Sequence, residues 1–171
     1  MILRPASLDD VSALAALGRD SFCAAFEHLY RPEDLSTFLE QVFSDKAVAE
    51  EVVGDRYTHH LACDEKGLAG FCKLKSPSDY GEYSDAKNPV ALGQLYTEPA
   101  RTGLGIGAKL MDWALTEARQ RGHDAVQLSV YSENYGAQRF YERYGFAKIA
   151  DIGFWVGQQR DAEFLYELRL R

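Results

Sequence analysis

The chain lacks any apolar run of the ~18 residues that a membrane-spanning helix needs, and MILRPASLDD has no signal-peptide pattern. We therefore expect a cytoplasmic protein with no membrane partner. Cysteine is scarce: Cys23, Cys63 and Cys72 are odd in number, widely spaced and set among apolar neighbours. They predict buried reduced thiols rather than a disulfide framework or a metal site. Basic charge is also in deficit. The net charge of −7 disfavours nucleic acid as a partner and would mildly attract a cationic substrate.

What is present fits one globular domain spanning residues 1–171. The composition is 46% hydrophobic and 26% charged, which is ordinary for a folded chain long enough to bury a core. No internal repeat, low-complexity tract or domain boundary interrupts it.

Hydrophobic periodicity divides the N-terminal half into helices and strands. A short strand is expected at Ile2 to Arg4, followed by three helices with a 3.6-residue period and then a hairpin with a two-residue period. The helices are expected from about Val11 to Phe22, Pro32 to Phe43 and Lys46 to Val53, and the hairpin strands at Thr58 to Glu65 and Leu68 to Lys75. Ser76 to Pro89 is polar and is expected to be a mobile loop.

The stretch from Val90 to Leu110 organises the rest of the chain. Its first part reads as a buried strand that Pro99 ends, and its last part begins an amphipathic helix. Between them Gly103, Gly105 and Gly107 stand at alternate positions. Glycines placed there let the backbone approach a ligand closely and expose the first N–H groups of the helix, which favours phosphate binding.

This glycine turn does not match two familiar phosphate loops. A Walker loop needs a Lys-Ser/Thr pair that is missing, and the spacing GxGxG differs from the GxGxxG of dinucleotide-binding folds. A ligand-free β–α turn stays open at this point.

A second motif follows a second central strand, expected at Ala125 to Tyr131. Residues 134–146 have the form NxxAxxFYxxxGF, in which Asn134 can cap a helix and Tyr141 turns away from the buried Phe140. The alternative is that all these aromatic residues belong to the core. Strands at Phe146 to Ile152 and Phe164 to Leu170, joined through FWVGQQRDA, should close the sheet.

Together the two motifs resemble the GNAT superfamily of acetyl-CoA-dependent N-acetyltransferases. The resemblance covers nearly the whole chain, and the second motif matches at all of its named positions. It implies a single α/β domain with a mixed, mostly antiparallel twisted sheet flanked by helices, in which the two central strands diverge into a V-shaped cleft. The first motif departs at Thr102, where the family usually has Gln or Arg, and Arg101 or Lys109 could compensate.

The resemblance also implies roles for individual residues. The backbone of the organising strand would hold the pantetheine arm and the acetyl carbonyl, and the turn would hold the pyrophosphate of acetyl-CoA, the cosubstrate. Asn134 would contact the pantetheine region, and Tyr141 would be the general acid that protonates the leaving thiolate. The strand and turn positions are Leu95, Tyr96, Thr97, Thr102, Gly103, Leu104, Gly105, Ile106, Gly107, Ala108 and Lys109.

A general base is missing from its usual place in the family. Many relatives carry a glutamate on the organising strand, whereas residues 91–94 are Ala-Leu-Gly-Gln. A primary amine with a pKa near ~10 is largely protonated at pH 7, so a base or a water chain is required. The hypothesis is that deprotonation runs through ordered water, aided by Glu98, Glu82 or Asp79.

The acceptor is expected to be a primary amine, a polyamine or another small amine. The pattern SFxxxFxHLYxPEDLxxFL and the acidic loop resemble bacterial enzymes that acetylate spermidine and spermine. Phe22, Phe26 and Tyr30 would line an apolar or cation-binding wall, or else belong to the core. By resemblance, a homodimer would be unsurprising.

Three other functions stay open from the sequence. One is a regulatory module that binds acetyl-CoA without turnover, and another is a protein or peptide N-acetyltransferase. The third is a nucleotide-binding α/β protein that uses the glycine turn for a different phosphate ligand.

Overall fold

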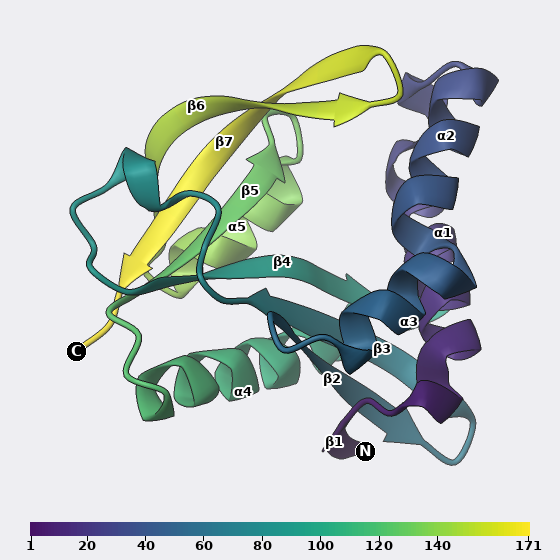
Figure 1. Cartoon of the computed structure of the whole chain (residues 1–171), viewed down its shortest axis with the longest axis horizontal. Coiled ribbons are helices and arrows are strands. Elements are labelled where there is room, and N and C mark those ends of the chain that lie inside the picture. The colour runs from purple at the N-terminus through teal and green to yellow at the C-terminus, as the bar shows by residue number, and fades with distance from the viewer.

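The computed structural model describes all residues 1–171 as one α/β domain around a seven-stranded sheet (Figure 1). The strand order is β1-β2-β3-β4-β5-β7-β6, and every neighbouring pair is antiparallel except β4 and β5. The strands are β1 (Ile2–Pro5), β2 (Tyr57–Asp64), β3 (Gly67–Lys75), β4 (Pro89–Thr97), β5 (Ala125–Tyr131), β6 (Ala147–Val156) and β7 (Gln159–Arg169). The predicted mixed, mostly antiparallel sheet is confirmed.

Helices cover both faces of this sheet. The first three form a column beside it, and α4 and α5 pack on the other face (Figure 1). They are α1 (Val11–Phe26), α2 (Pro32–Phe43), α3 (Asp45–Val53), α4 (Ile106–Gln120) and α5 (Tyr135–Arg143), with short 3₁₀ turns η1 (Leu8–Asp10), η2 (Glu27–Leu29), η3 (Gly81–Tyr83) and η4 (Pro99–Arg101). No helix is long and apolar enough to cross a bilayer.

Apolar side chains explain why the helices lie where they do. The apolar stripe of α4, including Leu110, Met111 and Ala114, is fully buried against the sheet. On the opposite face, Leu14 of α1 packs with Phe71 of β3. Burying such residues from both faces of the sheet stabilises the layers through the hydrophobic effect.

The central strands β4 and β5 diverge after a short paired segment. β4 pairs with β5 only at Pro89, Val90 and Ala91. Opposite β3 the register of β4 jumps from Leu92 to Gln94, so Gly93 is the extra residue of a β-bulge. The bulge bends β4 away from β5, and the predicted V-shaped opening is confirmed.

The C-terminal hairpin is longer than predicted. FWVGQQRDA was expected to join two strands, but β6 runs to Val156 and β7 begins at Gln159, with a turn at Gly157 and Gln158 between them. The tip reaches α2, where the Gln158 N–H donates to the Asp34 carboxylate at 2.9 Å. Residues expected in a connection therefore belong to a strand that crosses the molecule.

Candidate active site

A cavity of about 480 Å³ opens where β4 and β5 diverge. Nine residues predicted for the site line it: Phe22, Phe26, Tyr30, Leu95, Tyr96, Thr97, Thr102, Asn134 and Tyr141. They come from α1, β4, α5 and the residues that flank η2, η4 and α5, so the fold collects residues that are more than a hundred positions apart. The polar lining residues that the sequence did not single out include Ser21, Tyr80, Gln94, Ser129, Tyr131 and Glu163.

One wall of the cavity is exposed backbone. Beyond Ala91, β4 keeps its partner β3 on one side but has none on the side of β5. Backbone groups of residues 92–97 that face β5 are thus free to bind a ligand, as expected for Leu95, Tyr96 and Thr97. The Thr97 carbonyl also accepts a hydrogen bond from Ser21 Oγ at 3.3 Å.

The glycine turn leads from this wall into α4. Gly103 and Gly105 have positive φ angles of 82° and 81°, which favour glycine, and no atom lies within 4 Å of where a Cβ would stand. Lys109 N–H, which donates to the Gly105 carbonyl at 3.1 Å, is the first paired amide of the helix. The amides before it are unpaired at the positive end of the helix dipole, and this arrangement fits a pyrophosphate.

Side-chain charge near the turn is distributed unevenly. Arg101 Nη1 lies 2.5 Å from the Asp64 carboxylate and its Nε lies 2.8 Å from Glu98, so two acids already hold this guanidinium. Lys109 is exposed on the first turn of α4 and makes no ion pair. Of the two cations suggested as replacements for the usual side chain, Lys109 is the one that keeps its charge free.

Tyr141 lies on the cavity wall, near the C-terminal end of α5. Asn134 caps this helix as predicted, accepting a hydrogen bond from the Ala137 N–H at 3.3 Å. The Tyr141 ring packs against Phe140 and Phe146, with centroids 5.4 and 5.9 Å away, but its hydroxyl has no protein partner. Burial raises the pKa of Tyr141 to about 12, so the hydroxyl keeps its proton at neutral pH.

Aromatic rings form the wall of the cavity on the side of α1. Phe22 stacks on Tyr30 with centroids 5.9 Å apart, and Phe26 meets Tyr131 of β5 edge-on at 6.0 Å. Phe154 joins them from the hairpin. Phe22 is also part of the apolar cluster between α1 and α2, so the same side chain lines the cavity and packs in the core.

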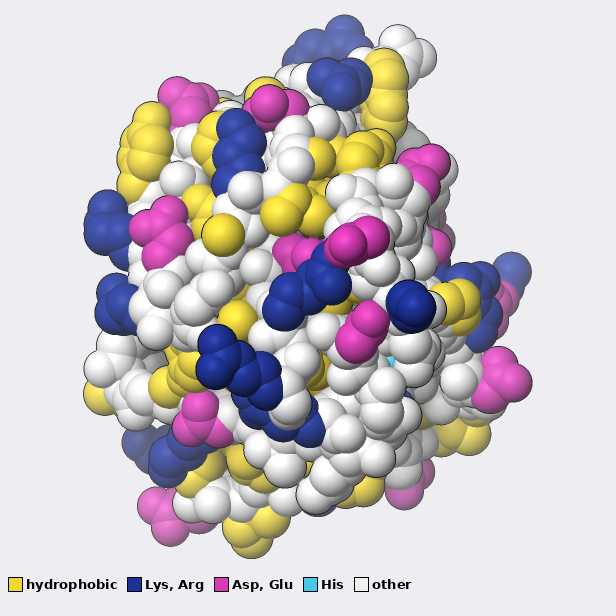
Figure 2. Space-filling model, turned by 90° about the vertical axis from the view of Figure 1, so that its left-hand side faces the viewer, with side chains coloured by type: hydrophobic (Ala, Val, Ile, Leu, Met, Phe, Trp, Pro, Cys, Tyr) yellow, Lys and Arg dark blue, Asp and Glu magenta, His cyan; other side chains and the backbone are white.

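The three acids proposed from the sequence do not line this cavity. Glu98 is held by Arg101, Glu82 is exposed on η3, and Asp79 pairs with Lys75 at 2.5 Å. Asp85 of the same loop pairs with Arg169. Basic side chains accordingly lie beside acidic ones on the face shown in Figure 2, rather than leaving a surface of one sign.

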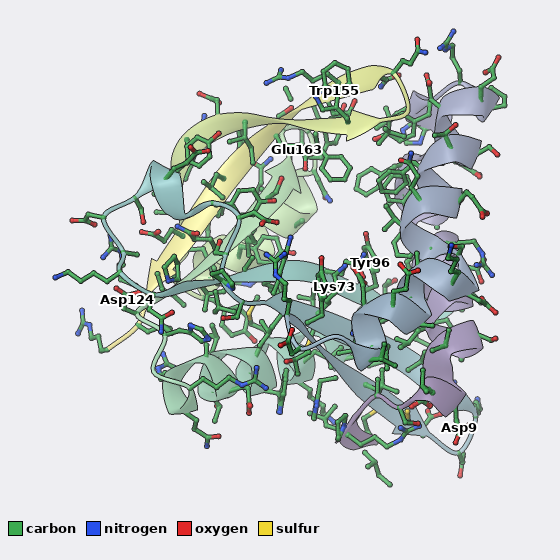
Figure 3. The ribbon with its side chains drawn as sticks, viewed as in Figure 1. Asp9, Lys73, Tyr96, Asp124, Trp155 and Glu163 are labelled. Carbon is green, nitrogen blue, oxygen red and sulfur yellow. The ribbon has the colours of Figure 1, made fainter.

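Glu163 is the acid that does line the cavity, and the sequence reasoning missed it. The strand had been expected to begin at Phe164, which left Glu163 in a connection. The available signal was the two-residue period of β7, where Asp161, Glu163, Leu165 and Glu167 share one face. Figure 3 shows Glu163 on β7 and Tyr96 on β4, and both line the cavity.

Comparisons with known proteins agree with this geometry. The model of the acetyltransferase (GNAT) family matches residues 19–146. An uncharacterized N-acetyltransferase of Lactobacillus delbrueckii subsp. lactis is 26% identical over 162 residues, covering 94% of this chain and 92% of that protein. Spermidine N(1)-acetyltransferase of Thermoplasma acidophilum is 24% identical over 153 residues, covering 87% and 89%.

Solved structures show the same fold. PaiA N-acetyltransferase from Thermoplasma acidophilum, in complex with coenzyme A, superimposes with a TM-score of 0.81 at 22% identity, covering 99% of this chain and 98% of that one. The chain therefore belongs to the acetyltransferase (GNAT) family. It is an acyltransferase with acetyl-CoA as its cosubstrate.

Proposed function

We propose that this protein transfers the acetyl group of acetyl-CoA to a primary amine, a polyamine or another small amine, by direct attack, with Tyr141 as general acid. The observation that carries the proposal is the free Tyr141 hydroxyl on the wall of the cavity where β4 and β5 part. Acetyl-CoA supplies an activated acyl group. The exposed backbone of β4 is suited to hold its pantetheine arm and acetyl carbonyl, and the amides of the glycine turn are suited to hold its pyrophosphate.

Tyr141 has the properties that a general acid needs in this reaction. Its pKa of about 12 keeps it protonated across the working pH range, and no protein group competes for its proton. As the carbon–sulfur bond breaks, the hydroxyl would donate to the departing sulfur, which would otherwise leave as a thiolate.

A small amine as acceptor is supported by the size and lining of the cavity. Its aromatic wall suits an alkyl or cationic group. The relative named spermidine N(1)-acetyltransferase makes a polyamine one candidate. The acids of the η3 loop add little to this, because Asp79 and Asp85 are already paired with cations.

The test is a coenzyme A release assay with acetyl-CoA and a panel of polyamines, small amines, amino acids and peptides. We expect release with one amine class and a loss of at least tenfold in kcat for Tyr141→Phe, about 1.4 kcal/mol of transition-state stabilisation. Tyr166→Phe is the control, since it removes a hydroxyl bound to Glu142 at 3.1 Å outside the cavity.

Two outcomes would count against the proposal. If the protein bound acetyl-CoA but released no coenzyme A with any acceptor, we would conclude that it is a regulatory module rather than an enzyme. If only peptides reacted, the small-amine acceptor would be wrong while the general acid could still be tested with the same two variants.

A further inference from the structure

Glu163 is the one residue lining the cavity that has an acidic side chain. No Lys, Arg or His joins it there. The remaining lining is apolar, aromatic, hydroxyl or amide. Any charged group of an acceptor that enters this space must therefore be matched by a single carboxylate.

The strand geometry aims this carboxylate at the cavity. Alternate residues of β7, including Phe164 and Tyr166, pack toward α4 and α5, which leaves Glu163 on the opposite face. In register, Glu163 stands opposite Tyr131 of β5, beyond the point where β4 and β5 have separated. Its side chain enters the site from β7, whereas the family glutamate is expected on the strand that here reads Ala-Leu-Gly-Gln.

The hydrogen bonding of Glu163 is incomplete, unlike that of its neighbours on the same face. Asp161 accepts hydrogen bonds from the Tyr30 hydroxyl and the Gln159 side-chain amide. Glu167 accepts one hydrogen bond from Gln127 and one from Arg169, and both are 2.7 Å long. Glu163 accepts one hydrogen bond, from Ser129 Oγ to Oε1 at 2.8 Å. Its Oε2 has no protein donor and the residue makes no ion pair, although it is only 9% exposed.

The surroundings of Glu163 hold no cation that would keep it ionised. Burial, with repulsion from Asp161, raises its pKa to about 7, and the Ser129 hydrogen bond only partly opposes this. The other titratable groups around it are neutral phenols from α1, β4, β5 and the η3 loop, namely Tyr30, Tyr80, Tyr96 and Tyr131. A carboxylate poised near neutral pH can both attract an ammonium and take its proton.

We propose that Glu163 binds the ammonium of the acceptor and takes its proton, and that the acceptor is a primary amine with an apolar or aromatic arm and no carboxylate beside the reacting nitrogen. The inference rests on the proposed function and deepens it. An acceptor with a carboxylate next to its amine would bring a second negative charge into a cavity without any cation, at a large desolvation cost.

The protons balance as follows. Glu163 takes one proton from the ammonium, and the freed nitrogen electron pair forms the bond to the acetyl carbonyl carbon. The carbon–sulfur bond breaks and the sulfur takes the proton of Tyr141. The second proton of the nitrogen restores Tyr141, and Glu163 returns its own proton to solvent. One proton is released for each acetyl group transferred.

The experiment compares wild type, Glu163→Gln and Glu167→Gln between pH 6 and 10. The acceptors are matched pairs that have a single amine and differ by one carboxylate: 2-phenylethylamine with phenylalanine, and 3-methylbutylamine with leucine. Glu167→Gln is the control because it neutralises another buried acid on the same face of β7, outside the cavity. Coenzyme A release gives kcat/KM, and the KM for acetyl-CoA is measured alongside.

We expect wild type and Glu167→Gln to share a rise in kcat/KM centred near pH 7 and to prefer the member of each pair without the carboxylate by at least tenfold. In Glu163→Gln the rise near pH 7 should vanish. Its rate should fall at least tenfold at pH 7.5 and recover toward pH 10, where the amine loses its own proton. The KM for acetyl-CoA should not change.

A second variant keeps the carboxylate and changes only its surroundings. Ser129→Ala removes the hydrogen bond that stabilises the ionised form, so the rise in its pH profile should move to higher pH. The role of Glu163 would be overturned if the pH profile of kcat/KM did not shift in Ser129→Ala, or if Glu163→Gln had the pH profile of wild type. Equal rates within the matched pairs would overturn the acceptor class.

These failures differ from failure of the proposed function. If Glu163→Gln behaved like wild type while wild-type protein acetylated an amine, only the present inference would be lost. If wild-type protein acetylated no amine at all, the proposed function would be overturned and this inference with it.

Discussion

The two ends of the cavity are built in different ways. The end that we propose for acetyl-CoA consists mainly of backbone: the open side of β4 and the unpaired amides of the glycine turn before Lys109. The end that we propose for the acceptor consists of side chains, with the rings of Phe22, Phe26 and Tyr30 lining the same cavity as Glu163 of the C-terminal hairpin. In this proposal a constant cosubstrate is bound by backbone, and a variable acceptor by side chains that substitution can change without altering the fold.

Substitution should therefore affect the two ends separately. A change at the glycine turn should alter the KM for acetyl-CoA, and a change in the aromatic wall should alter the KM for the amine. A variant that moved both by the same factor would mean that the two ends act as one site.

The largest effect is expected at Gly105. Gly105→Ala forces a side chain onto a φ of 81°, which costs about 1–2 kcal/mol of stability and displaces the amides that we propose to bind the pyrophosphate. We expect the KM for acetyl-CoA to rise at least tenfold, with the KM for the amine unchanged.

Gly122 provides a matched control at the other end of α4. It has the same φ of 81° and equally open surroundings, but it follows the C-terminal end of α4, away from the glycine turn. Gly122→Ala should lose as much stability as Gly105→Ala in thermal unfolding and leave both KM values as they were. An equal rise in KM for acetyl-CoA in the two variants would show that strain, rather than the lost amides, is responsible.

An intermediate effect is expected on stability, where two acids of one strand should respond in opposite directions. Burial raises the pKa of Glu163 from 4.5 to about 7, so its contribution to stability is complete below pH 4.5 and is lost as the pH rises through 7. At pH 8 the free energy of unfolding of Glu163→Gln should therefore exceed that of wild type by about 1–3 kcal/mol, which raises the unfolding temperature. At pH 4.5 the two proteins should unfold at nearly the same temperature.

Glu167 should behave in the reverse way. Burial alone would raise its pKa, but hydrogen bonds from Ser84, Arg169 and Gln127 hold the pKa below its usual value. Its stabilisation is present above the unfolded pKa and is lost as the pH falls, so Glu167→Gln should destabilise the protein at pH 8. Thermal unfolding at the two pH values checks both signs, and equal shifts for the two variants would contradict them.

The difference between the two ends of the cavity also determines how much of the site the sequence predicted. The glycine spacing and NxxAxxFYxxxGF are local patterns that predict Gly105, Asn134 and Tyr141 directly, and of these Asn134 and Tyr141 line the cavity. At the acceptor end Phe22, Phe26 and Tyr30 were predicted, but the acid that faces them was not. Glu163 lines the same cavity because the hairpin β6–β7 brings β7 beside β5. The predicted strands of this hairpin are too short, so no local pattern in the sequence points to this placement.

The acids that were chosen instead show the limit of composition. Glu98 and Asp79 lie near the organising strand or in an acidic loop, but each has a cation within ion-pair distance. Which carboxylate stays unpaired depends on where Arg101 and Lys75 come to lie in the fold. Sequence distance from the motif carries no information about that.

The smallest effect is expected in the aromatic wall. Phe26 lines the cavity, with its ring 5.2 Å from that of Phe22 and edge-on to Tyr131. Phe26→Leu keeps the position apolar and removes the ring face, so the expected loss is a cation–π interaction of about 0.5–1 kcal/mol. We expect the KM for a cationic amine to rise roughly two- to fivefold, with kcat and the KM for acetyl-CoA unchanged.

Trp155 supplies the control, because its ring is 61% exposed on the hairpin and does not line the cavity (Figure 3). Trp155→Leu should leave the KM for the amine unchanged. If Phe26→Leu instead raised the KM for acetyl-CoA, the ring would contact the cosubstrate, and the boundary between the two ends would lie closer to α1 than the cavity lining indicates.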